Sequence, residues 1–212
     1  MHPLDALIRR YVAPLAKAAG CIRSGRTFRL IADSGDQAMF DFHTHAVDPD
    51  MVVFEVNWHI APLPYWEWIT RQRVPTPKLT NSSGAMATCR VMPPQEAAHH
   101  PRDGFPFFRE RWVFPYEGSD KICGQALERT LREETLPRMR HLLDRSNLLE
   151  VVRSRDVSLV MRMNPLAREI VLRVDSGPVE EISALIAQEE ATGRFPPFAQ
   201  WARRRLAERI PN

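Results

Sequence analysis

Acidic and histidine side chains alternate with other residues in two neighbouring segments, residues 37–46 and 51–60. The alternating positions hold Asp41, His43, His45, Glu55, Asn57 and His59. Successive residues of a β-strand point to opposite faces of the sheet, so these side chains share one face if both segments are strands. Imidazole and carboxylate groups carry much of enzymatic acid–base chemistry and bind divalent metals. The pattern therefore predicts a polar sheet face suited to chemistry or recognition.

This polar face has several interpretations. If the two strands are antiparallel with His43 opposite Glu55, the paired Cβ atoms lie roughly 4.5–5.5 Å apart. Glu55 then orients His43 as a general base, which makes these two the candidate catalytic residues. Alternatively, His43, His45 and His59 hold a divalent metal. The face also fits recognition of a partner or ligand, or a plain solvent-exposed surface. The sequence leaves these open, and no cofactor is expected except a divalent metal under the metal interpretation.

The candidate ligand-binding residues include two members of this face and three others. They are Asp41, Asn57, Arg26, Trp66 and Trp68. Arg26 lies in the first strand segment, beside these two strands if sequential strands pair, and a guanidinium donates two parallel hydrogen bonds to a carboxylate or phosphate. The alternative for Arg26 is a surface ion pair with Asp33 or Asp36. Trp66 and Trp68 fall in a proline-rich connection over residues 61–84, where an indole can face a ligand or pack inward.

Charge and composition exclude several classes of protein. The net charge is only +3, and the basic residues 203–205 and 209 spread around a helix, which argues against nucleic-acid binding. No segment approaches the roughly 18 apolar residues of a membrane helix. Three cysteines without metal-like spacing, and no apolar leader, predict buried thiols in the cytoplasm.

The elements that position these residues indicate an α+β fold. Helical spacing over 4–18 precedes the strand segments, further strands are expected at 85–92 and 107–114, and a helix at about 120–134. We expect an antiparallel sheet of about five strands with helices packed on one face. Residues 1–155 form this core domain. Residues 156–212 add a β-hairpin, from 157–163 and 169–174, and two helices, packed on the core or on a second subunit.

Several short motifs resemble the bacterial family called domain of unknown function 4304. They are Ser24-Gly-Arg-Thr-Phe28, Arg111-Trp-Val-Phe114, Leu136-Pro137 and Asn147-Leu-Leu-Glu-Val-Val152, within residues 3–155. The resemblance implies an α+β fold without an established activity. Some members lie near bacterial toxin genes, which fits immunity or accessory roles. This chain departs from the family pattern at His43-Thr44-His45 and continues beyond it over residues 156–212.

Together these features predict a cytoplasmic bacterial binding or accessory protein, of the immunity type or binding a small ligand, that uses the polar face. The expected partner is a protein or a small molecule, and residues 156–212 offer a route to an oligomer. The alternative is a small enzyme or metal-binding protein with a His/Glu site on the same face.

Overall fold

The computed structural model describes residues 2–45, 50–71, 84–98, 110–117, 119–154 and 158–209. The chain divides into two compact units. Unit 1 comprises residues 1–31, 38–59 and 88–140, and unit 2 comprises residues 32–37, 60–87 and 141–212. The predicted boundary near residue 155 lies inside unit 2, and the assignment of 1–155 and 156–212 as domains stays a prediction.

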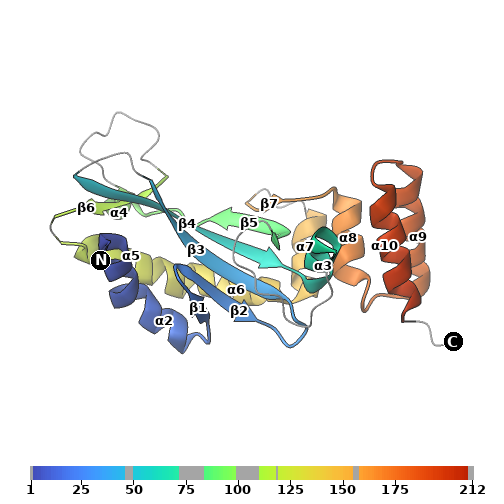
Figure 1. Cartoon of the computed structure of the whole chain (residues 1–212), viewed down its shortest axis with the longest axis horizontal. Helices are drawn as coiled ribbons and strands as arrows, with labels where there is room; N and C mark the ends of the chain where they lie inside the picture. The colour runs from blue at the N-terminus through green and yellow to red at the C-terminus, as the bar shows by residue number, and fades with distance from the viewer. Residues whose placement is uncertain are drawn as a thin grey trace. The chain divides into compact units, whose positions relative to one another are not determined.

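The predicted α+β fold with an antiparallel sheet is confirmed, with more strands than expected (Figure 1). Within the described residues the strands are β1 (Ile22–Ser24), β2 (Thr27–Ile31), β3 (Gln37–His45), β4 (Met51–Ala61), β5 (Ala87–Arg90), β6 (Trp112–Pro115) and β7 (Val160–Met161). Their hydrogen-bonded order is β1-β2-β3-β4-β5-β7, and β6 also pairs with β4. In the antiparallel β4–β6 pair, Phe54 lies opposite Trp112. One extra strand is β1, which forms a hairpin with β2 in which Ile22 lies opposite Arg29, and the other is β7 within the predicted segment 157–163.

The apolar face of the unit 1 sheet carries a ladder of aromatic rings. Phe40 and Phe42 alternate with the polar residues of β3, as the period of a strand requires. Phe40 stacks on Phe28 with ring centres 5.0 Å apart, and Phe42 lies 6.2 Å from Phe54. Phe54 in turn stacks on Trp112 at 6.3 Å. All these rings are buried, so the core of unit 1 lies on the face opposite the polar residues.

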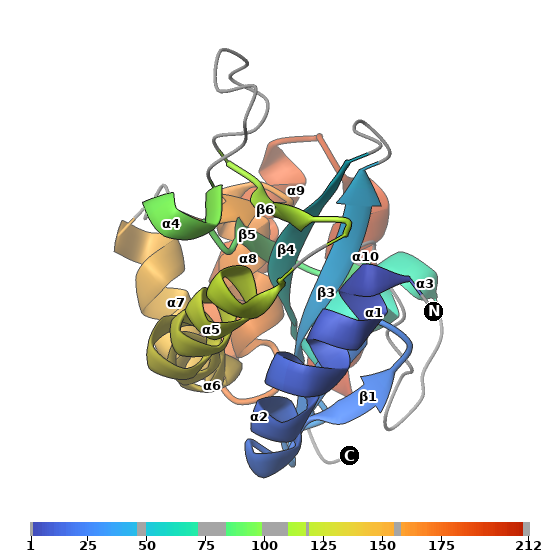
Figure 2. The same cartoon turned by 90° about the vertical axis from the view of Figure 1, so that its left-hand side faces the viewer.

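Two long helices of unit 1 lie side by side under this apolar face (Figure 2). The first runs through α1 (Pro3–Leu7), a π-helical turn (Ile8–Val12) and α2 (Ala13–Ala18). The second runs through α5 (Lys121–Thr130), a π-helical turn (Leu131–Thr135) and α6 (Leu136–Leu143). Each π turn ends two residues before a proline, Pro14 or Pro137. A proline ring clashes with the carbonyl four residues earlier, and the wider π turn relieves that clash. The short helix α4 (Gln95–Ala98) packs on α5.

Unit 2 is mainly helical, and its C-terminal helices pack in chain order. They are α3 (Leu63–Thr70), α7 (Arg145–Ser154), α8 (Pro165–Arg173), α9 (Val179–Ala191) and α10 (Pro196–Ala207). Helix α7 packs on α8, α8 on α9, and α9 on α10 (Figure 1), while α3 also contacts α8. The two predicted C-terminal helices correspond to α9 and α10.

The predicted C-terminal hairpin is wrong, because residues 169–174 belong to α8 and its end rather than to a strand. Asn164 caps this helix by accepting a hydrogen bond from the backbone N–H of Ala167 at 2.8 Å, and Pro165 occupies the first helical position. Ala167, Ile170 and Val171 then form a buried helical stripe. The cap and the stripe together outweigh the β propensity of the branched residues.

The irregular connection predicted for residues 61–84 is also partly wrong. Residues 63–70 form α3, while residues 72–83 lie outside the described part of the chain. Pro62 and Pro64 are compatible with this helix because they precede and begin its first turn, where backbone N–H groups have no helical partner.

Candidate functional site: the polar sheet face of unit 1

A buried carboxylate lies at the centre of the polar face and contacts two histidines. Asp41 on β3 is 4% exposed. One of its oxygens, Oδ1, lies 3.0 Å from Nε2 of His43 and 3.4 Å from Nε2 of His59 on β4. An ionised carboxylate only accepts hydrogen bonds, so each Nε2 donates. His59 is buried, and its Nδ1 lies 3.0 Å from the Thr88 hydroxyl on β5, which donates to it in this tautomer. The exposed His43 ring is thus fixed through a buried side chain.

A second buried carboxylate, Glu55 on β4, contacts three side chains that can carry positive charge. Its Oε1 lies 3.3 Å from Nε2 of His45, 3.2 Å from Nη2 of Arg90 and 2.9 Å from Nη2 of Arg111. Arg90 also donates to the exposed Glu110 at 3.0 Å. These partners come from β3, β5 and the residue before β6. Glu55 therefore joins several strands of the face through one carboxylate.

The predicted pairing of His43 with Glu55 does not occur. Glu55 contacts His45, and His43 contacts Asp41 instead. Both cross-strand contacts, Asp41 with His59 and His45 with Glu55, indicate a register offset by two residues from the expected one. A register shift of two residues leaves every side chain on its predicted face, so the polar face contains the predicted residues although their partners differ. The catalytic roles assigned to His43 and Glu55 stay predictions.

The three histidines proposed as metal ligands do not gather at one point. His43 and His59 share Asp41, whereas His45 contacts Glu55. Among the described residues, no group of three or more His, Cys, Asp or Glu side chains is placed to hold a metal ion. The geometry therefore does not favour the metal interpretation.

The remaining candidate ligand-binding residues have separate positions. Asn57 is half-buried on β4, between Glu55 and His59 on the polar face. Arg26 lies in the β1–β2 turn and donates to both oxygens of Asp5, at 2.7 and 3.1 Å, so its ion-pair partner is neither Asp33 nor Asp36. This pair lowers the pKa of Asp5, chiefly through the hydrogen bond from Arg26.

The two candidate tryptophans belong to α3 in unit 2. Trp66 is buried, while Trp68 is half-buried and packs on α10. The Trp68 ring centre lies 5.2 Å from Phe198 and 5.9 Å from Trp201. Two further histidines, His99 and His100, are adjacent in a proline-rich stretch of the sequence, which does not favour a metal site, and they lie outside the described residues.

Sequence reasoning missed two residues of the face, Thr88 and Arg111, and favoured a structural role for a third, Arg90. All lie at alternate positions on the same side as Glu55, but they come from distant segments. The alternation of Thr88 and Arg90 in a predicted strand was a usable signal. The sequence did not predict which strand lies beside β4.

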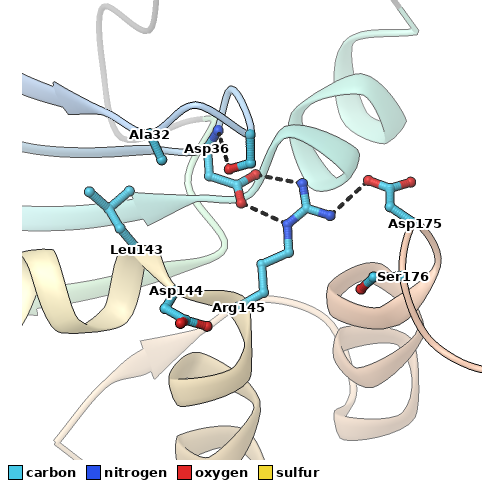
Figure 3. A pocket seen from close by; sticks show the side chains of 8 residues that line it. Ala32, Asp36, Leu143, Asp144, Arg145, Asp175 and Ser176 are labelled. Atoms are coloured by element: carbon cyan, nitrogen blue, oxygen red, sulfur yellow. Dashed lines mark hydrogen bonds and ion pairs between the residues drawn. The ribbon is translucent and has the colours of Figure 1, made fainter.

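Unit 2 contains a second charged cluster that the sequence did not reveal. Asp36, 2% exposed, accepts hydrogen bonds from Arg145 Nε at 2.7 Å and Nη2 at 2.8 Å, and from the Leu63 backbone N–H at 2.7 Å. Arg145 also donates to Asp175 at 2.7 Å, as Figure 3 shows. Burial alone would lower the pKa of Arg145, but the hydrogen bonds and charges of the two aspartates raise it.

This cluster continues into α10 and borders a cavity. Arg205 donates to both oxygens of Asp175, at 2.6 and 3.0 Å, and contacts Glu67 of α3. The cavity of about 670 Å³ is lined in part by Asp36, Arg145 and Asp175 (Figure 3). Arg145 and Arg205 are largely buried, with side chains 16% and 14% exposed, whereas His43 and Arg90 on the polar face are more exposed, so we assign this cluster a structural role within unit 2.

No family model, curated protein or solved structure matches this chain. The resemblance to the domain of unknown function 4304 family accordingly stays a prediction. In the described part of the chain, no helix combines the length and the apolar character that crossing a membrane requires.

Proposed function

We propose that this protein is a binding or accessory protein whose recognition surface is the polar face of unit 1. One observation carries the proposal. Two buried carboxylates, Asp41 and Glu55, each contact side chains that can carry positive charge and that come from more than one strand. Taking a carboxylate out of water costs several kcal/mol, and the attraction to its partners offsets that cost only in good geometry. Two such groups on one face contribute little net stability, so a role in recognition accounts better for their presence.

The physical consequence is that the outer side chains are held in place before binding. His43, whose side chain is 56% exposed, is oriented by Asp41, and Arg90, 34% exposed, is held by Glu55 and Glu110. A side chain that is already ordered loses less conformational entropy when a partner binds. Arginine and other fixed polar groups at the centre of an interface contribute strongly to affinity. A sheet face offers such groups over a broad area, which favours a protein partner of the immunity type.

The test is complex formation with the products of neighbouring genes. We expect one of them to form a 1:1 complex that survives gel filtration. Replacing Arg90 with Ala should weaken the complex by about tenfold or more, which is about 1.4 kcal/mol. Arg194→Ala is the matched control, because Arg194 is an exposed arginine of unit 2. The proposal fails if no neighbouring product binds, or if Arg90→Ala and Arg194→Ala have the same effect.

A second candidate, acid–base catalysis, rests on the His43–Asp41 pair. With Nε2 donating to Asp41, the neutral ring leaves its Nδ1 lone pair free to accept a proton. If a screen of hydrolytic or proton-transfer substrates detects turnover, His43→Ala should abolish it in a variant that circular dichroism shows to be folded. Full activity in His43→Ala would exclude this candidate.

A further inference from the structure

A second cavity in unit 2 is built from α3 and α10. Its volume is about 390 Å³, and it is lined by Glu67, Arg71, Trp201, Arg204 and Glu208. Small-molecule sites commonly have volumes of roughly 300–1,000 Å³. The cavity combines an indole ring with two guanidinium groups, which sets it apart from the cavity beside Asp36.

Among the described residues, the two arginines of this cavity have no acidic partner. In the described part of the chain, neither Arg71 nor Arg204 forms a side-chain hydrogen bond or an ion pair. Glu67, by contrast, is already bound by Arg205. The cavity lining therefore holds two arginines and two glutamates, and within the described residues the guanidinium groups of Arg71 and Arg204 are the unpaired ones.

Aromatic packing positions one of these guanidinium groups. Arg71 lies over the Trp68 ring, 3.6 Å from its centre, and Trp68 packs on Trp201 of α10. Stacking on an aromatic ring fixes the plane of a guanidinium and leaves its N–H groups at the edge free to donate. Arg71 ends α3 with a left-handed backbone, φ 60°, and its N–H donates to the carbonyl of Glu67 at 2.9 Å. Arg204 follows Trp201 by one helical turn, so the second guanidinium approaches from α10.

We infer that this cavity binds a small organic anion, a carboxylate or phosphate carried on a flat ring. Two free guanidinium forks match the paired oxygens of a carboxylate or phosphate. Trp201 is 7% exposed, and the part of its indole that lines the cavity offers an apolar contact for a ring. This site is independent of the polar face of unit 1, and its ligand is a small molecule rather than a protein partner.

Calorimetry and tryptophan fluorescence with simple probes test the inference. Phenylacetate and phenyl phosphate represent the two anion classes, and inorganic phosphate and acetate lack the ring. We expect 1:1 saturable binding of at least one ring-bearing probe, about tenfold tighter than its ringless counterpart. The tighter of the two ring-bearing probes identifies the anion class.

Variants then locate the binding. Arg71→Gln and Arg204→Gln should each weaken the tighter probe by about tenfold. Arg194→Gln, which removes an exposed arginine of the same unit, should not. All three positions are exposed, and circular dichroism verifies that each variant folds. The inference is overturned if neither ring-bearing probe saturates by about 10 mM, if the ring adds nothing, or if either cavity variant binds as the control does.

Discussion

Replacing Arg145 with Met tests the charged cluster of unit 2 most severely. The change removes two hydrogen bonds to Asp36 and one to Asp175, and leaves Asp36 with the Leu63 N–H as its remaining cross-element donor. Asp36 is 2% exposed and the Arg145 side chain 16% exposed, so solvent screens the pair little. Removing one partner of a buried ion pair costs about 3–5 kcal/mol. We expect a loss of that size in the free energy of unfolding.

Urea denaturation of Arg145→Met, Asp36→Asn and the double variant measures these losses, and the double-mutant cycle gives the coupling energy between Arg145 and Asp36. The double variant should be more stable than the two single losses predict, by about 1–3 kcal/mol, because removing both charges leaves neither one buried alone. Arg145→Lys keeps the charge but not the two-pronged geometry, and should show an intermediate loss. An Arg145→Met loss below about 1 kcal/mol, or strictly additive losses, would refute this reasoning.

Three further outcomes are expected in unit 1. A Cβ on Gly124 would clash with the Tyr11 ring, so Gly124→Ala should lower the free energy of unfolding by about 1–3 kcal/mol in urea denaturation. Adding Tyr11→Ala should restore most of that loss, and an unchanged midpoint in Gly124→Ala contradicts the packing. Burial raises the pKa of Cys123 to about 12, so iodoacetamide at pH 8 should label it, by mass spectrometry, only after unfolding. The lowered pKa of Asp5 means that its stabilisation is present above pH 3.8 and lost as the pH falls below that value. Asp5→Asn should reduce the acid-dependent loss in the free energy of unfolding by at most about 1 kcal/mol, because the Asp5–Arg26 pair is partly exposed. An unchanged pH dependence excludes a contribution from this pair.

The polar face was predictable because the period of a strand does not depend on register. Alternation over residues 37–46 and 51–60 placed Asp41, His43 and Glu55 on one side before any pairing was known. The register was not predictable, because the connection between two antiparallel strands sets it. Residues 46–49 of that connection lie outside the described residues. The expected contact of His43 with Glu55 depended on register and does not form, while the catalytic roles of the two residues stay predictions.

The two predictions of secondary structure that were wrong each rested on a single local signal. Ile170, Val171 and Val174 favour strands by propensity, yet the Asn164 cap and Pro165 begin a helix. Prolines near residue 63 suggested an irregular connection, although proline is favoured at the start of a helix. The Arg145 cluster joins residues more than one hundred positions apart, and no local pattern reports such a contact.

The most direct test of the polar face as a recognition surface is histidine footprinting with diethyl pyrocarbonate. His43 is exposed on this face, and His141 is an exposed histidine of unit 2. In the complex with a neighbouring gene product, we expect modification of His43 to slow by about tenfold or more while His141 reacts as in the free protein. A stable complex in which His43 reacts at its free rate would contradict the account.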